Sequence, residues 1–167
     1  MTARVQIKPV ITQEEYSLSS KILRESYAAV ALDFGLTASN CPSNAAFIND
    51  DELQHKKNDR LEYFLAMLDR HPIGFIAIEQ AFNTPEIFYI EKVAILPEYR
   101  RKGCGKQLMD FATDRIRNSG GREISLGIIA ANTSLKNWYL KQGFVDAGEK
   151  NFPHLPFTVC FLRKELT

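Results

Sequence analysis

The segment Tyr99–Lys106 combines residue types that suit the binding of a phosphate group. Gly103 and Gly105 are separated by one residue, so the backbone can turn tightly and expose consecutive N–H groups with no Cβ atom to block an anion. A helix that begins here adds the unpaired N–H groups of its first turn and the positive end of its dipole. The turn is flanked by cations, among them Arg100, Arg101 and Lys102. Together these features predict a pyrophosphate site.

Two common phosphate-binding patterns do not fit this segment. A Walker A loop needs a glycine five residues before the Gly-Lys pair and a Ser or Thr after the lysine, but those positions hold Arg100 and Gln107. A dinucleotide fingerprint needs a third glycine where Leu108 stands, after a strand of a parallel sheet. Both interpretations therefore fail.

The segment lies between a predicted strand and a predicted helix. Glu86–Leu96 is mostly apolar and follows the turn residues Asn83-Thr84-Pro85. After the glycines, Leu108, Ala112 and Ile116 recur at helical spacing until Gly120-Gly121 ends the pattern. The phosphate would thus meet the N-terminus of a helix of about four turns.

The rest of the chain predicts a β-α-α-β-β-β-α-β-α-β-β order, an antiparallel meander followed by a βαβ crossover. Thr12 and Glu15 form a capping box at the start of the first helix. The other expected elements are a strand Arg4–Ile11, a first helix running to about Leu32, a second helix starting near Ser43 and carrying Phe47 and Leu53, a hairpin of Leu61–Leu68 and Ile73–Gln80, a strand through Ile124, Leu126 and Ile128, a helix Thr133–Gln142, and final strands Phe144–Ala147 and Phe157–Leu162.

The phosphate segment and its lead-in resemble the acyl-CoA-binding signature of the GNAT superfamily of N-acyltransferases. In that family the signature is Gln/Arg-x-x-Gly-x-Gly/Ala after a strand, which Arg100-x-x-Gly103-x-Gly105 matches, preceded by Val93-Ala94-Ile95-Leu96-Pro97. About thirty residues on, Ala131–Phe144 resembles the second conserved block, with an Asn after a strand, a Tyr in the next helix and Gly-Phe at its end. The resemblance covers roughly residues 70–147 at motif level.

This resemblance implies an α/β, GNAT-like acyl-CoA N-acyltransferase fold over residues 1–167 as a single domain. The central sheet is expected to be mixed, mostly antiparallel, with about six or seven strands flanked by about four helices. The strand ending in Val93-Ala94-Ile95 would splay from its neighbour and pair with the pantetheine arm through its backbone. A backbone N–H near Val93 or Ala94 would polarise the thioester carbonyl. Coenzyme contacts are expected from Val93, Ala94, Ile95, Arg100, Arg101, Lys102, Gly103, Cys104, Gly105, Lys106, Asn132 and Asn137.

The chemistry of amine acylation indicates which side chains to seek. The amine must be neutral to attack, although a lysine-like amine has a pKa of about 10.4, so a carboxylate or a water held by one can take its proton. The departing thiolate gains from a proton or a hydrogen bond, which a phenol can give. The family places such groups near Glu91, the candidate base, and Tyr139, the candidate acid. Glu91 lies two residues before Val93, so alternation predicts that both side chains point to one face.

Other residues carry competing interpretations. Cys104 at a helix N-terminus beside cations could have a lowered pKa, but packing is favoured because no His or third group stands near it. His154, between Pro153 and Pro156, could contact substrate or act as base, and an exposed turn histidine is the favoured alternative. Asn49–Glu52 could attract a cationic amine, although stabilisation of the helix start through its dipole is favoured. Tyr27, Phe34 and Phe47 could line an acceptor pocket or fill the core.

Composition is typical of a globular protein of one domain. Apolar residues make up 45% and charged residues 25% of 167 residues, and the net charge of +1 gives no indication of nucleic-acid or membrane partners. Neither an apolar run of about 20 residues nor a signal-like N-terminus is present. The three cysteines, Cys41, Cys104 and Cys160, lack a zinc spacing. We expect a cytoplasmic protein with reduced thiols and no metal, while dimerisation stays open.

The leading hypothesis is transfer of an acetyl group from acetyl-CoA, as co-substrate, to a primary amine of a small molecule. A non-catalytic acyl-CoA sensor and an acetyltransferase acting on a protein N-terminus or lysine are the alternatives. Asn132 and Tyr139 argue against a pure sensor, because a binding module has less use for the phenol. The sequence does not identify the acceptor, because Asp33–Asp59, the segment expected to select it, carries no recognisable motif.

Overall fold

The computed structural model describes residues 3–167 and contains one seven-stranded sheet with helices on both faces. The strand order is β1-β2-β3-β4-β5-β7-β6, and every neighbouring pair is antiparallel except β4 and β5. The predicted fold class and element order are therefore confirmed. The strands are β1 Gln6–Pro9, β2 Leu61–Leu68, β3 His71–Gln80, β4 Ile87–Ile95, β5 Glu123–Ile129, β6 Val145–Asn151 and β7 Thr158–Glu165.

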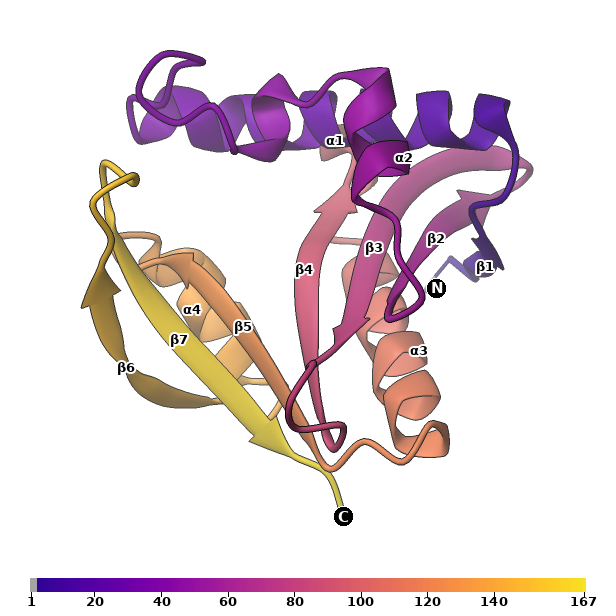
Figure 1. Ribbon diagram of the computed structural model, residues 1–167. Helices are drawn as coiled ribbons and strands as arrows, with labels where there is room; N and C mark the ends of the chain where they lie inside the picture. The colour runs from indigo at the N-terminus through magenta and orange to yellow at the C-terminus, as the bar shows by residue number, and fades with distance from the viewer. Residues whose placement is uncertain (1–2) are drawn as a thin grey trace.

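Four α-helices cover the sheet: α1 Gln13–Asp33, α2 Asp50–Lys56, α3 Cys104–Asn118 and α4 Thr133–Leu140. Helices α1 and α2 lie across one end and face of β2–β4, and α3 lies behind the same strands (Figure 1). The predicted capping box at α1 is confirmed, because Thr12 Oγ1 accepts from Glu15 N and the Glu15 carboxylate accepts from Thr12 N. No helix among residues 3–167 is both long and apolar enough to cross a bilayer.

The predicted second helix is wrong in its extent, because the chain breaks it in two. A short 3-10 turn, Ala45–Phe47, is followed by α2, which begins only at Asp50. Asn49 is extended and its side-chain oxygen accepts from Asp51 N and Glu52 N, so it starts a new helix instead of continuing the old one. Other bounds also differ: β1 is shorter than the predicted Arg4–Ile11, α4 ends at Leu140, β6 reaches Asn151 and β7 reaches Glu165.

The β2–β3 hairpin is tighter than the sequence indicated. Asp69 and Arg70 both have positive φ, 48° and 68°, as the two central residues of a two-residue hairpin turn require. The strand therefore resumes at His71, and Leu68 pairs with it.

Two buried clusters fix the sheet between its helices. One joins β3 and β4 to α3 through Ile76, Ile90 and Leu108, among others. The other joins β2, β3 and β4 to α1 and α2 through Phe75, Leu23 and Leu53. Burial of these faces holds β4, which carries the candidate site, in a fixed position between both layers.

Candidate functional site

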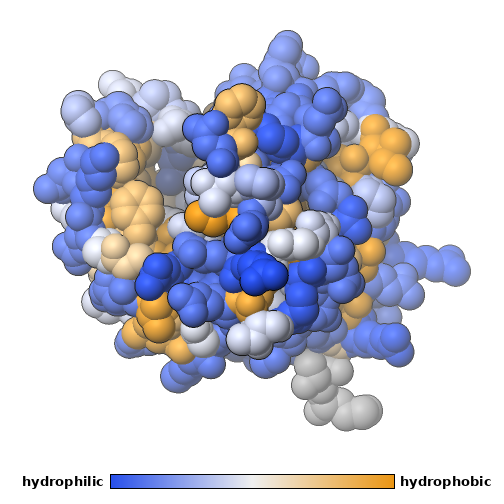
Figure 2. Space-filling model, turned by 60° about the horizontal axis from the view of Figure 1, so that its bottom comes forward, coloured by the Kyte–Doolittle hydropathy of each residue, from blue (hydrophilic) through white to orange (hydrophobic). Residues whose placement is uncertain are grey.

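A large cavity, which we call the main cleft, opens where β4 and β5 separate. These parallel strands pair only through Ile87–Tyr89 and Glu123–Ser125, and beyond that point they diverge (Figure 1). A cleft of about 960 Å³ fills the gap. In the space-filling view the surface is hollowed between a smaller lobe and the main body (Figure 2). From Ile90 onward the β4 edge facing β5 has no sheet partner, so its backbone groups can pair with an extended ligand.

The glycine-rich segment forms one end of this cleft. Arg101 and Gly103 have left-handed backbone angles, with φ of 60° and 80°, and α3 begins at Cys104. Gly103 occupies the N-cap position and no side chain caps the helix. The first-turn N–H groups of this 15-residue helix are thus left for an anion. Gly105 also lets α3 approach α4, because a Cβ there would stand 3.1 Å from the Trp138 ring.

The cations of this segment have different surroundings. The Arg100 guanidinium donates to Ile95 O at 2.9 Å and to Ser26 O at 2.7 Å, so it ties the end of β4 to α1. Lys102 lies over the Tyr99 ring, and Lys106 pairs with Asp110 at 2.7 Å. Arg101 lines the cleft and forms no ion pair with another residue in the range 3–167. Arg101 is therefore the cation least committed to other contacts.

Some of the residues predicted to bind the coenzyme line the cleft and others do not. Val93, Ala94, Ile95, Arg100, Arg101, Gly103, Gly105, Lys106 and Asn132 line it. Lys102, Cys104 and Asn137 lie outside its lining. The Cys104 side chain is buried in the core, and burial raises the pKa of its thiol. This agrees with the packing interpretation and removes the electropositive activation that a reactive cysteine requires.

Helix α4 forms the wall opposite β4. Asn132 caps this helix, because its side-chain oxygen accepts from Leu135 N at 3.3 Å, and its amide nitrogen has no hydrogen-bond partner within the described chain. Leu135 and Trp138 also line the cleft and were missed from the sequence. The sequence shows the helical spacing of Leu135, Trp138 and Tyr139. Apolar residues at this spacing are, however, as typical of a buried core as of a pocket lining.

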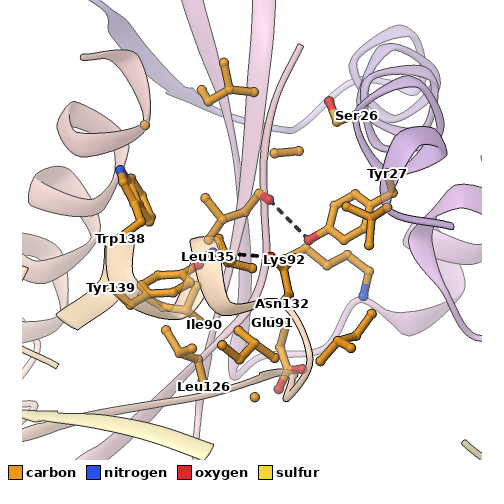
Figure 3. Close-up of a pocket in the computed structure, with 18 of the residues that line it drawn as sticks. Ser26, Tyr27, Ile90, Glu91, Lys92, Leu126, Asn132, Leu135, Trp138 and Tyr139 are labelled. Carbon is orange, nitrogen blue, oxygen red and sulfur yellow. Dashed lines mark hydrogen bonds between the residues drawn. The ribbon is translucent and has the colours of Figure 1, made fainter. Parts of the chain in front are cut away.

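Tyr139 projects from α4 toward β4 (Figure 3). Only 5% of its surface is exposed, and its ring packs edge-on against Trp138 and Phe144. Its hydroxyl forms no hydrogen bond with any described residue, yet it is not among the fully enclosed unsatisfied atoms, so it faces the cleft. Burial, reinforced by the nearby Tyr27 phenol, raises the pKa of Tyr139. At neutral pH the phenol is therefore protonated and free to donate.

Glu91 lies at a β-bulge, and this corrects the predicted facing of its side chain. Ile90 pairs with Ile78 and Lys92 pairs with Ala77, so Glu91 is an extra residue with no partner on β3. The bulge shifts the alternation, and Ile90 and Val93 consequently both pack toward α3. Glu91 instead points to the opposite face together with Lys92, so the expectation that Glu91 and Val93 share a face is wrong.

The Glu91 carboxyl is accessible at the mouth of the cleft. Enough protein surrounds it that the loss of water raises its pKa, and the neighbouring Glu79 carboxylate adds to the rise. Lys92 acts in the opposite direction. Glu91 is consequently a more basic carboxylate than an ordinary surface glutamate, which is a useful property in a group that accepts protons.

Tyr27 belongs to the site. From the sequence, it could have lined a pocket or filled the core. Its hydroxyl donates to the Val93 carbonyl at 3.2 Å, so α1 holds β4 directly at the splay (Figure 3). Burial raises the pKa of this phenol, which keeps it a donor. Beside it, the Ser26 hydroxyl is fully enclosed and has no partner in the described structure, although Ser26 belongs to the cleft lining.

Known proteins share sequence features with this chain. The model of the acetyltransferase (GNAT) family matches residues 29–144. The chain belongs to the GNAT family. An uncharacterized N-acetyltransferase of Staphylococcus epidermidis is 32% identical over 89 residues, 52% of each chain. An N-alpha-acetyltransferase of Saccharolobus solfataricus is 28% identical over 102 residues, 55% of this chain and 61% of that one. The chain thus aligns with about half to three fifths of the length of these relatives.

Solved structures agree on the fold. The PaiA N-acetyltransferase of Thermoplasma acidophilum, solved in complex with coenzyme A, superposes with a TM-score of 0.74 over 98% of this chain and 99% of that one, at 18% identity. At that identity the likeness concerns the fold. The GNAT match nevertheless extends the resemblance, because it begins at residue 29 and so includes the end of α1, where the motifs gave no indication.

The other residues considered for the acceptor site lie outside the cleft lining or serve in capping and packing. His154 is exposed beside Phe152, outside the cleft lining, although Leu155 and Phe157 of the same turn line it. The Asn49–Glu52 cluster is used in capping α2 and in holding Arg24 and Ser17 through Asp50. Phe34 and Phe47 pack in a small apolar cluster with Leu36. Among residues 3–167 no group of three His, Cys, Asp or Glu side chains could hold a metal.

Proposed function

We propose that this protein transfers an acetyl group from acetyl-CoA to a primary amine of a small molecule by direct attack. The observation that carries the proposal is the unpaired edge of β4, which runs from Glu91 past Tyr139 to the uncapped start of α3. It offers an extended arm a backbone to pair with and a pyrophosphate a set of N–H groups. The coenzyme-bound structure of similar fold supports acyl-CoA as co-substrate.

The backbone does most of the coenzyme binding in this proposal. N–H groups at Gly103–Gly105 hold the pyrophosphate, with Arg101 as the nearest free cation. Val93–Ile95 pair with the pantetheine, and the Asn132 amide donates to it. An N–H of Val93 or Ala94 stabilises the negative charge that develops on the acetyl oxygen. Tyr27 keeps this stretch of β4 in place through the Val93 carbonyl.

Glu91 and Tyr139 carry the proton transfers. Glu91, directly or through a water, takes the proton of the acceptor ammonium, and the neutral nitrogen bonds to the acetyl carbon as the carbon–sulfur bond breaks. Tyr139 donates its hydrogen to the departing sulfur. Since the pKa of Tyr139 is raised, the phenol is a hydrogen-bond donor throughout the pH range of most assays. Glu91 passes this first proton to solvent, and the second proton, released as the nitrogen becomes an amide, restores the Tyr139 phenol, so the products are the amide, the coenzyme A thiol and one proton.

A protein N-terminus is a second candidate acceptor, because one similar protein is named an N-alpha-acetyltransferase. We favour a small molecule, since a second cavity, of about 310 Å³, adjoins Glu91 beside the end of α2. A pure acyl-CoA sensor would not need the unpaired Tyr139 phenol.

Release of coenzyme A with a panel of amines and peptides tests the proposal. Turnover is expected with at least one small amine. Tight acetyl-CoA binding with no turnover on any amine or peptide would favour the sensor.

A further inference from the structure

A second cavity, of about 310 Å³, adjoins the coenzyme cleft on the face covered by α2. Its lining combines residues from the end of α2, the segment after it, β2, β3 and β4: Lys56, Asn58, Leu61, Tyr63, Ala77, Glu79, Glu91 and Lys92. Glu91 and Lys92 also line the main cleft, so the two spaces meet at the bulge. We call this second space the annex.

The annex holds four charged side chains, two of each sign. Glu79 and Glu91 supply carboxylates, and Lys56 and Lys92 supply ammonium groups. Within residues 3–167 none of the four forms an ion pair or a side-chain hydrogen bond, although the opposite charges are neighbours. In Figure 3 the Glu91 carboxylate and the Lys92 ammonium end apart, pointing in different directions.

The surroundings disfavour the charged forms of two of these groups, Lys92 and Glu91. Loss of water, followed by the repulsion of Lys56, lowers the pKa of Lys92. Loss of water, followed by the repulsion of Glu79, raises the pKa of Glu91. A partly desolvated charge without a partner is costly, and a ligand of opposite charge removes that cost. A bare cationic amine would relieve the carboxylates only and would be repelled by both lysines.

We propose that the annex is the acceptor pocket and that it recognises an amino-acid-like molecule, which carries a carboxylate as well as the amine to be acetylated. The carboxylate binds between Lys56 and Lys92, and the amine lies between Glu79 and Glu91. The bulge places the amine at the junction with the coenzyme cleft, next to the candidate base. This inference rests on the proposed acetyl transfer and adds the chemical class of its acceptor.

Free amino acids compared with their own α-carboxamides give the test, because the pair differs in the carboxylate and keeps the side chain. Coenzyme A release is measured for a panel of such pairs with wild-type protein. We expect kcat/KM to be about ten- to hundredfold higher for the acids, the range for a lost charge-assisted contact. The amides have the less basic amines, so at neutral pH a larger fraction of each amide carries the neutral nitrogen that attacks. The supply of neutral amine therefore favours the amides and cannot imitate this result.

Lys92→Met and Lys56→Met should raise KM for the acids by a similar factor but should not raise KM for the amides, because each substitution removes a cation that repels their amine. The comparison within each variant cancels any effect of the lost lysine on Glu91. Lys92→Arg should keep the preference. Lys57→Met is the matched control, because Lys57 is the exposed neighbour of Lys56 outside the annex. Acetyl-CoA affinity, measured for each variant, shows that the fold and the coenzyme site are intact.

Amides used as well as the acids would overturn the inference and leave the proposed function standing. Peptides used better than both would overturn the inference and the small-molecule acceptor, and would leave acetyl transfer itself standing. Equal losses for acids and amides in Lys92→Met and Lys56→Met would also overturn it. Absence of turnover on every amine would instead overturn the proposed function, and the inference with it.

Discussion

The two sides of β4 present different kinds of chemical groups to a ligand. On the side of the main cleft, the strand edge and the start of α3 present backbone groups, and the side chains mostly maintain the geometry, as Arg100 does between Ile95 and Ser26. On the side of the annex, a bulge presents side chains of both charges. A shared coenzyme can be recognised by a fixed backbone shape, whereas an acceptor that differs among relatives requires exchangeable side chains.

The largest effect is expected from removal of the Tyr139 hydroxyl, which lies in the main cleft. Tyr139→Phe should lower kcat by about a hundredfold or more, because general acid help in the transition state is lost. Acetyl-CoA affinity should change little, since the ring and its packing remain. Steady-state kinetics and calorimetry measure the two quantities. A turnover number equal to wild type would remove Tyr139 from the mechanism.

Glu91→Gln tests whether the Glu91 carboxylate, on the annex side of β4, acts as the base. We expect kcat/KM at neutral pH to fall by about a hundredfold. Wild-type kcat/KM should rise as pH increases through the raised Glu91 pKa, because the carboxylate form is the base. The variant should lose that limb and keep the one set by the acceptor amine. A pH–rate profile with the same limbs in both proteins would exclude Glu91 and point to a water or His154.

Tyr27→Phe tests whether α1 holds the splay. Loss of the hydrogen bond to Val93 O should cost about 1 kcal/mol, and so reduce acetyl-CoA affinity about fivefold. Calorimetric titration measures this effect. Ser26→Ala is the matched control beside it, because the Ser26 hydroxyl has no partner in the described structure. Similar losses in both variants would contradict a specific role for the Tyr27 bond.

The smallest effect on catalysis should come from the far end of α1. Thr12→Ala removes the N-cap and should lower the free energy of unfolding by about 1 kcal/mol. The kinetic constants should not change, because Thr12 is remote from both cavities. Urea unfolding together with the coenzyme A assay separates stability from function, and a fall in kcat would show that the cap affects the site.

The same contrast explains how much the sequence could predict. Gly103 and Gly105 reveal the phosphate turn because few residue types tolerate its backbone and its close approach to Trp138. The order of elements follows from periodicity and caps, as at Thr12. The bulge at Glu91 has no sequence signature, so simple alternation gave the wrong face. The annex also escaped prediction, since Glu79 and Lys56 reach Glu91 only through strand pairing and the path of the chain after α2.

The central claim is that main-chain N–H groups at the start of α3 bind the coenzyme pyrophosphate. Calorimetric titration of acetyl-CoA into a Gly103→Val, Gly105→Val double variant tests it most directly. Gly120→Val is the control, because Gly120 has a similar φ of 87° with nothing within 4 Å of an added Cβ. We predict at least about a hundredfold loss of affinity in the double variant, as for two lost hydrogen bonds to a charged group, and wild-type affinity in the control. Unchanged coenzyme affinity in a folded double variant would contradict the account.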